Sequence, residues 1–265
     1  MKHKIIMAVS LCALLTACKK NEDTTPVTSN PLSSVTIKYP GTNDSVKYNV
    51  TYTNNRLSGL NLVSNRNGVS SDNVYTITRN SAGVITGVTT SGGSSTIGYN
   101  TTFGQYSYSL QPYSGYTDST AYTYTGENIT QAITYRMYSG GSYAPQTKTV
   151  YTYNSGNSVT QVQTYSYVGA AWVPQATYSY TFDTNSNPLH LNSEALVLAG
   201  ASTLGTENLT FMGLNNVSGI TYEDMINPVN NYATTYTYTY NSYGVPVSAT
   251  GTYSTGGSTT ISYAY

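Results

Sequence analysis

The sequence predicts an all-β protein: an antiparallel meander of repeated tyrosine-rich hairpins, curled strongly or closed into a barrel-like sheet. Aromatic and β-branched residues alternate with polar ones, which is the period of a half-buried strand. Turns rich in Asn and Gly separate these runs and suit tight hairpins. The chain has 29 Tyr against 3 Phe and 1 Trp. Since Tyr buries its ring while its hydroxyl stays wet, we expect sheets with both faces near water and no thick dry core.

The first residues have the layout of a secretory signal peptide. A basic start at Lys2 and Lys4 precedes an apolar run over residues 5–15, which is shorter than the ~20 residues that span a bilayer. Leu15-Thr16-Ala17-Cys18 is similar to the lipobox of bacterial lipoproteins, in which the Cys thiol is acylated and becomes the new N-terminus. We therefore expect a signal peptide over residues 1–17 and lipidation at Cys18. An ordinary signal peptide with a chance Cys is the alternative.

Residues 18–32 read as a lipidated Cys and a flexible tether rich in Thr, Ser, Asn and Pro. Lys19 stands where some lipoproteins carry the Asp that holds them at the inner membrane, so the resemblance favours the outer membrane, at its periplasmic face or at the cell surface. The run 19–23, basic and then acidic, looks like the export tags of surface lipoproteins in Bacteroidetes. The expected partner is a membrane, reached through the lipid anchor.

Charge and cysteine content exclude several classes of protein. Basic and acidic residues number 11 each, and loss of Lys2 and Lys4 would leave the mature chain slightly acidic, without a basic patch for nucleic acid. Charged residues make up 8% of the chain, against ~25% in typical soluble domains. Cys12 would leave with the signal peptide and Cys18 would carry lipid, so no disulfide is expected.

An internal repeat organises residues 33–265, which we expect to form one all-β domain. Segments 138–146 and 167–175 match at a shift of 29 residues, with Tyr, Gly, an aromatic residue, Pro and Gln in equal positions. About eight hairpins follow one another, and curling or closure of the sheet protects its edges. Equal shifts place Tyr143 and Trp172 on neighbouring loops at one rim.

Helical periodicity is absent from the sequence. We expect at most a single helical turn in each of two places, at 193–199 and at 222–226.

The Tyr-x-Tyr-Asn-x-x-Gly turns and the tyrosine-rich ending, residues 236–265, resemble a family of Bacteroidetes lipoproteins of unknown function with a porin-like fold. They are also similar to the tyrosine-aspartate repeats of secreted bacterial shell and toxin proteins. This chain differs from the second family, because Asn replaces Asp and the repeat unit is longer. The resemblance implies a porin-like fold and brings no catalytic residues with it.

No catalytic, metal or cofactor site is predicted. His190 is the only His outside the expected signal peptide, and no Gly-x-Ser-x-Gly motif accompanies it. Glu223 and Asp224 are adjacent, and neighbours on a strand point to opposite faces. No calcium-loop spacing is present. We expect no enzyme, and a carbohydrate-active hydrolase is the alternative.

Four aromatic residues are the candidate ligand-binding residues: Tyr143, Trp172, Tyr113 and Tyr116. They fall in Gly- or Pro-containing connections that we expect to lie off the strand ladders. Flat rings beside Asn, Gln and Thr suit recognition of carbohydrate, whereas cross-strand aromatic packing is the alternative. The predicted function is a non-enzymatic binding or structural module of the cell envelope, with carbohydrate or an envelope protein as partner.

A membrane-spanning outer-membrane barrel is a further alternative. Tyr265 ends an alternating aromatic strand, as in such barrels. Spanning strands need an outward apolar band, which runs such as 121–125 and 147–149 do not offer.

Three Asp-Ser/Thr triplets are similar to the acceptor for O-glycosylation in exported Bacteroidetes proteins. They place acceptors at Thr24, Ser45 and Ser119. A chain rich in Ser and Thr also produces such triplets by chance. A glycan at any of them requires an exposed side chain.

Overall fold

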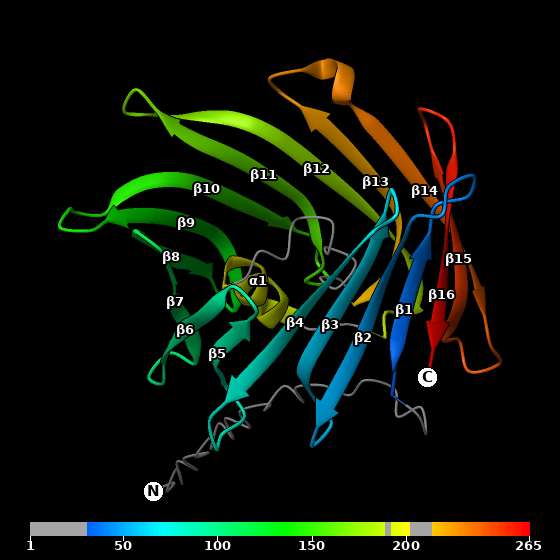
Figure 1. The fold of residues 1–265 in the computed structure, drawn as a ribbon, viewed down its shortest axis with the longest axis horizontal. Coiled ribbons are helices and arrows are strands. Elements are labelled where there is room, and N and C mark those ends of the chain that lie inside the picture. The colour runs from blue at the N-terminus through cyan, green and yellow to red at the C-terminus, as the bar shows by residue number, and fades with distance from the viewer. Residues whose placement is uncertain (1–30, 189–191, 202–213) are drawn as a thin grey trace, which may run out of the picture.

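The computed structural model describes residues 31–188, 192–201 and 214–265. Its strands form one closed antiparallel barrel in which each strand pairs with the next along the chain (Figure 1). Strand β1 (Ser34–Lys38) closes the ring by pairing with β16 (Ser258–Ala264). The predicted all-β meander is confirmed, and of the two forms that the sequence left open the barrel is the closed one.

The barrel has sixteen strands, which correspond to eight hairpins in sequence. The strands between the first and the last are β2 (Ser45–Thr53), β3 (Arg56–Arg66), β4 (Val69–Arg79), β5 (Ile85–Thr90), β6 (Gly93–Asn100), β7 (Gln105–Tyr113), β8 (Tyr116–Thr125), β9 (Asn128–Tyr138), β10 (Ala144–Tyr153), β11 (Val159–Val168), β12 (Ala171–Ser186), β13 (Asn215–Asp224), β14 (Tyr232–Tyr240) and β15 (Pro246–Tyr253).

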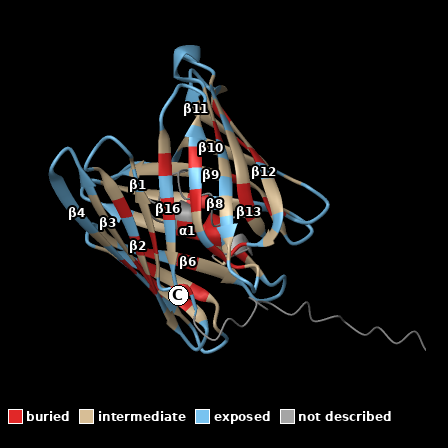
Figure 2. Ribbon diagram, turned by 90° about the vertical axis from the view of Figure 1, so that its right-hand side faces the viewer, coloured by how far each residue is buried: buried red, intermediate tan, exposed pale blue. Residues whose placement is uncertain are grey.

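Because the strands alternate in direction, the connections divide between two rims. The first rim carries the connection between β1 and β2 and every second connection after it, including 139–143 and 169–170. The second rim carries the other connections and Tyr265. In Figure 2 the loops at both rims are exposed, while buried residues lie along the strands.

Three hairpins at the second rim share one five-residue turn, which begins at Asn80, Asn154 or Asn241. In each, the Asn side-chain oxygen accepts hydrogen bonds from the backbone N–H groups two and four residues later. The fourth residue has a positive φ, 81° at Gly83 and 73° at Gly244. The Asn-x-x-Gly pattern of the sequence is therefore a turn closed by its own side chain.

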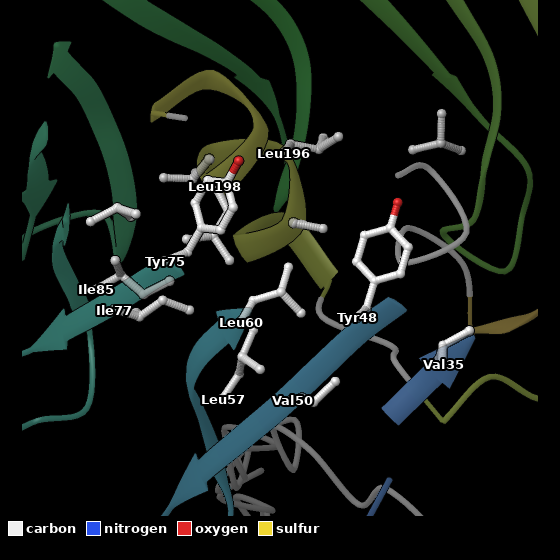
Figure 3. Close-up of a cluster of buried hydrophobic side chains, with 14 of the residues drawn as sticks. Val35, Tyr48, Val50, Leu57, Leu60, Tyr75, Ile77, Ile85, Leu196 and Leu198 are labelled. Atoms are coloured by element: carbon white, nitrogen blue, oxygen red, sulfur yellow. The ribbon is translucent and has the colours of Figure 1, made fainter. Parts of the chain in front are cut away.

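Side chains alternate between the two faces of the barrel wall. On β2, Val46, Tyr48 and Val50 are buried, whereas Lys47 and Thr51 are exposed. Figure 3 shows Tyr48, Leu60 and Tyr75 gathered in the interior with Leu196 and Leu198. Tyr48, Tyr75, Tyr106 and Tyr180 are buried in an interior cluster, and other tyrosine rings pack against it. Less of the inner face is therefore near water than the composition predicts.

A helix, α1 (Asn192–Ala201), lies inside the barrel against β5, β6, β7 and β9 (Figure 1). It is longer than the single turn expected at 193–199. Its residues Ala195 to Leu198 are all buried. A helix surrounded by protein is apolar on every side, so it carries no 3.6-residue period for sequence analysis to detect.

The second expected helical turn, at 222–226, is not formed. Strand β13 continues to Asp224. A short 3₁₀ helix, η2 (Pro228–Asn230), follows in the connection to β14. Within the described residues, no helix is long and apolar enough to cross a membrane.

Candidate functional site

The interior of the barrel is divided into two halves, and α1 fills one of them. The carboxylate of Glu194 accepts two hydrogen bonds of 2.8 Å from the Arg79 guanidinium on β4. The hydroxyl of Tyr106 on β7 donates to the same carboxylate at 3.1 Å. Arg79 also donates to the carbonyl of Gly83 at 2.7 Å. These bonds fix the helix to the wall formed by β4–β9.

The other half of the interior contains a cavity of about 920 Å³, enclosed by β1–β3 and β13–β16. Aliphatic side chains such as Val46, Leu62 and Ile261 line it, together with tyrosine rings. Its size lies within the ~300–1,000 Å³ typical of small-molecule sites. The cavity is the candidate functional site.

Polar residues stand where the cavity reaches the first rim. Tyr39, Asp44, Arg66 and Asn230 line it there. The Arg66 guanidinium lies 5.9 Å from the centre of the Tyr39 ring. The Asp44 carboxylate accepts a hydrogen bond of 2.8 Å from the backbone N–H of Asn67. The cavity therefore has a middle lined by aliphatic and tyrosine side chains, the buried amides of Asn187 and Asn216 toward the second rim, and a polar, charged mouth at the first rim.

The tyrosine hydroxyls in the cavity are neutral hydrogen-bonding groups. Burial raises the pKa of Tyr236, Tyr238 and Tyr263 above the ordinary value, and neighbouring tyrosines raise the pKa of Tyr236 and Tyr238 further. Tyr238 donates to the carbonyl of Val217 at 2.9 Å. These side chains remain protonated at neutral pH, so they offer hydrogen bonds without charge.

One hydroxyl beside the cavity has no hydrogen-bond partner within the described residues. Tyr180 is buried, and its oxygen is unpaired. Its neighbour across the ladder is Ile220, which lines the cavity. An unpaired buried hydroxyl costs about 1–3 kcal/mol. A polar group on a bound molecule could satisfy it.

Two of the predicted ligand residues, Tyr113 and Tyr116, lie on strand ladders, and the expectation that they lie in a connection is wrong. They pair directly across β7 and β8, and their rings stack with centres 4.7 Å apart. The Arg136 guanidinium lies 4.0 Å from the centre of the Tyr116 ring. Arg136 also forms an ion pair of 2.8 Å with Asp118. The pairing of β7, β8 and β9 places these four side chains on the inner face at the first rim.

Trp172 also lies on a ladder, in β12, where it pairs with Tyr167 of β11. The two ring centres are 5.0 Å apart. The Lys148 ammonium lies 4.1 Å from the centre of Tyr165 and 5.2 Å from Trp172. The register places this group on the outer face. Tyr143 alone is in a connection, and it is 44% exposed.

The connections 139–143 and 169–170 are at the same rim, as the shift of 29 residues predicts, although Trp172 stands on β12 beside the second connection and not in it. The Pro-Gln pair that both segments contain explains why their sequences match. Pro145 and Pro174 each precede a break in register, and the following Gln146 or Gln175 is the extra residue of a β-bulge. Each Gln donates to the carbonyl two residues before it. The four aromatic residues nevertheless occupy different faces and form no common site.

The other predicted positions are scattered. Ser45 and Ser119 lie on β2 and β8 and are partly exposed. Cys18, Thr24 and His190 fall outside the described residues.

The adjacent carboxylates Glu223 and Asp224 lie at the end of β13. Asp224 closes its loop by accepting hydrogen bonds from Ile226, Asn227 and Asn230, which lower its pKa, the bond from Asn230 most. In the described part of the chain, no three His, Cys, Asp or Glu side chains gather as a metal site would require.

Sequence analysis missed the cavity and its lining. The alternation marks two faces of each strand but does not show which face is inside, because Tyr and Thr favour strands equally. Tyrosine and aliphatic residues follow one another at every second position, as at 46–50 and 261–263, and so share the inner face. This spacing is the one signal that could have indicated the lining of the cavity.

No family model matches this chain, and no curated protein matches it. Among solved structures, a porin-like protein from Bacteroides uniformis is similar, with a TM-score of 0.58 at 14% identity over 89% of this chain and 98% of that one. A porin-like protein from Bacteroides vulgatus gives a TM-score of 0.45 at 12% identity over 88% and 98%. The first likeness shows that the chain has a porin-like barrel fold, as the resemblance implied. The lipoprotein character that the resemblance also implied stays a prediction.

Proposed function

We propose that this chain is a barrel of the cell envelope that binds an amphipathic small molecule, such as a single-chain lipid, in its interior. The observation that carries the proposal is the cavity of about 920 Å³, lined in its middle by aliphatic and tyrosine side chains and polar and charged at its mouth. Water-conducting barrels have a polar interior. This interior buries aliphatic and tyrosine side chains instead.

The lining matches the two parts of such a molecule. An alkyl chain would lie against Val46, Leu62 and Ile261, where each buried methylene contributes ~0.8 kcal/mol. A head group would lie at the first rim beside Arg66 and Asn230. Tyrosine hydroxyls within the cavity would accept or donate single hydrogen bonds, which give orientation more than affinity.

The test is binding of cis-parinaric acid, a fluorescent fatty acid, to the purified chain. We expect saturable enhancement of its emission. Ile220→Trp places a larger side chain in the cavity and should abolish that enhancement. Val74→Trp makes the same kind of change on the outer face, where Val74 is 49% exposed, and should leave binding intact. Circular dichroism of both variants checks that the barrel is folded.

Two results would contradict the proposal. One is the absence of saturable binding to the folded natural chain. The other is equal binding by Ile220→Trp and Val74→Trp, which would place the probe on the surface of the barrel.

A membrane-spanning barrel of outer-membrane type is the second candidate, and the porin-like fold supports it more directly than it supports a binding module. The natural test is the full chain with Cys18→Ser, which removes the expected lipid anchor. A spanning barrel stays in the membrane fraction through a urea wash, whereas release of the variant contradicts spanning. The same variant tests the lipoprotein proposal, because it should lose lipid labelling.

A further inference from the structure

The outer face of the barrel differs from one side to the other. On β14–β16 the outward side chains are almost all Thr and Ser, as at Thr237, Thr250 and Ser262, and these are exposed. On β7–β12 the outward positions toward the first rim carry mostly aromatic and apolar side chains. Residues in register across the strands therefore make one continuous apolar surface on a single side of the molecule.

This surface, called the aromatic wall below, is made by Tyr108, Ile133, Tyr135, Tyr165, Tyr167 and Trp172. Pairing links them through Ala121 and Lys148: Tyr108 lies opposite Ala121, Ala121 opposite Ile133, Ile133 opposite Lys148, and Lys148 opposite Tyr165. Tyr167 lies directly opposite Trp172. Tyr108 is 39% exposed and Tyr167 is 37% exposed. The other members are partly exposed.

The wall has a cation and no carboxylate. Lys148 stands in its middle, with its ammonium over the Tyr165 ring and near Trp172. The acidic side chain of Asp118 on β8 points to the other face, toward Arg136. Across strands β7–β12, all within the described residues, no Asp or Glu occupies an outward ladder position.

The wall is also confined to one half of its strands. Toward the second rim, the outward residues of the same strands become polar, for example Thr123, Gln161 and Thr181. Tyr167 and Trp172 stand beside the connection at the first rim. The apolar surface therefore begins at the first rim, where the mouth of the cavity also lies.

We propose that the aromatic wall lies against the surface of a lipid bilayer. Tyr and Trp favour the level of the head groups, where an apolar ring and a polar edge are both satisfied. A Lys stem can cover apolar surface while its ammonium reaches lipid phosphates. The outside of a barrel is convex, so it fits a soft, extended surface better than it holds a small ligand. Because the wall covers one side alone, this contact requires lying on the bilayer and not crossing it.

The expected lipid anchor permits this orientation. Strands β1 and β9 stand on opposite sides of the sixteen-strand ring. The path between them round the barrel is roughly 40–50 Å, from strand spacing and tilt. Leu32 is buried and Ser33 bonds to Ala264 at the second rim, so the reach comes from residues 18–31, which can extend to roughly 50 Å. An anchor at Cys18 could therefore hold the side that carries β9 against the membrane.

The single Trp of the chain makes the test direct, because Trp172 belongs to the wall. The full chain with Cys18→Ser is mixed with vesicles of phosphatidylcholine and a minor fraction of phosphatidylglycerol. We expect the Trp emission to shift to the blue and to be quenched by brominated lipid. Replacing Tyr135, Tyr165 and Tyr167 together by Thr keeps strand-forming residues and should lower the vesicle partition constant roughly tenfold or more.

The matched control changes three residues on the opposite side, Thr237→Ser, Thr250→Ser and Thr260→Ser, and should leave partitioning unchanged. Vesicles that neither shift nor quench the Trp emission overturn the proposal. Binding of the chain to carbohydrates on a glycan array, in place of binding to lipid vesicles, also overturns it. So does a partition constant that the three Tyr→Thr changes leave unchanged. A failure of fatty-acid binding in the cavity leaves this proposal standing, since the two surfaces share no residue.

Discussion

Tyrosine forms hydrogen bonds inside this barrel that phenylalanine, which has no hydroxyl, could not form. Inward tyrosine hydroxyls reach backbone carbonyls that the ladders leave free near the second rim. Tyr153 donates to Ile129 at 2.7 Å, Tyr238 to Val217 at 2.9 Å and Tyr265 to Pro246 at 2.8 Å. All three acceptors lie where the register between strands shifts. Breaks in a ladder expose carbonyls, and a tyrosine can bury its ring and satisfy them at once.

A pair of matched substitutions tests this role. Tyr153→Phe removes a hydroxyl bonded to a buried carbonyl and should lower the free energy of unfolding by about 1–2 kcal/mol. Tyr180→Phe removes a buried hydroxyl with no partner among the described residues, and should leave the free energy of unfolding unchanged or raised. Urea unfolding of both variants measures the difference. Equal losses of stability would contradict the role assigned to these hydroxyls.

The Asn turns allow a second test with single residues. Gly244 has a φ of 73°, which a residue with a Cβ adopts at a cost of roughly 1–2 kcal/mol. Gly244→Ala should therefore lower the thermal midpoint of unfolding. In the equivalent turn after Asn154, the positive φ falls on Asn157 and not on Gly156. Gly156→Ala should then be neutral or stabilising, and calorimetry that ranks the two variants the other way would exclude this account of the turn.

At the scale of elements, the internal helix depends on one carboxylate. Glu194 receives the Arg79 guanidinium and the Tyr106 hydroxyl, and it is the one acidic residue in the first turn of α1. The ion pair is partly buried, with side-chain exposures of 13% and 24%. The attachment of α1 to the wall therefore rests on a few directional bonds together with the packing of Ala195 to Leu198.

Glu194→Gln should loosen the helix and spare the barrel. Hydrogen bonds to charged groups contribute about 1.5–3 kcal/mol each, and the amide keeps only part of them. We expect faster hydrogen exchange at the amides of α1 while strand amides keep their protection. Asp118→Asn breaks the ion pair with Arg136, which lies on the β8–β9 wall, and should leave α1 unaffected. Uniform loss of protection across strands and helix in Glu194→Gln would show that α1 and the barrel unfold together.

For the molecule as a whole, the buried tyrosines couple stability to alkaline pH. Burial raises the pKa of Tyr52 and Tyr124 from the ordinary 10.0 to about 12. Burial also raises the pKa of Tyr122 and Tyr151. Between pH 10.0 and about 12, these tyrosines keep their protons in the folded chain and lose them in the unfolded chain. Their contribution to stability is therefore complete below pH 10.0 and is lost as pH rises toward the folded pKa values.

We expect cooperative unfolding in the window from pH 10.0 to about 12. Tyrosinate absorbance and strand circular dichroism should change together in one titration. Tyr52→Phe removes one of these groups and should move the midpoint to higher pH. Ionisation of most tyrosines around pH 10.0, with the strand signal unchanged, would mean that their hydroxyls are in water.

The local structure of this protein can be predicted from its sequence. The alternation over 46–52 and 236–240 fixed strands, because a period of two places side chains on two faces. Asn followed by Gly fixed the turns, because few residues tolerate a positive φ. The shift of 29 residues placed Tyr143 and Trp172 at one rim, since equal hairpins return to the same end. These features depend on neighbours in the chain and are readable there.

Long-range contacts set which face of the sheet lies inside and what the interior contains. Closure depends on sixteen strands joining β1 to β16, a contact between the two ends of the domain. The helix α1 has no amphipathic stripe, because the barrel surrounds it with apolar side chains. The cavity exists because one helix fills half of a ring of this width. Closure and internal filling are properties of long-range packing, and no local period in the sequence encodes them.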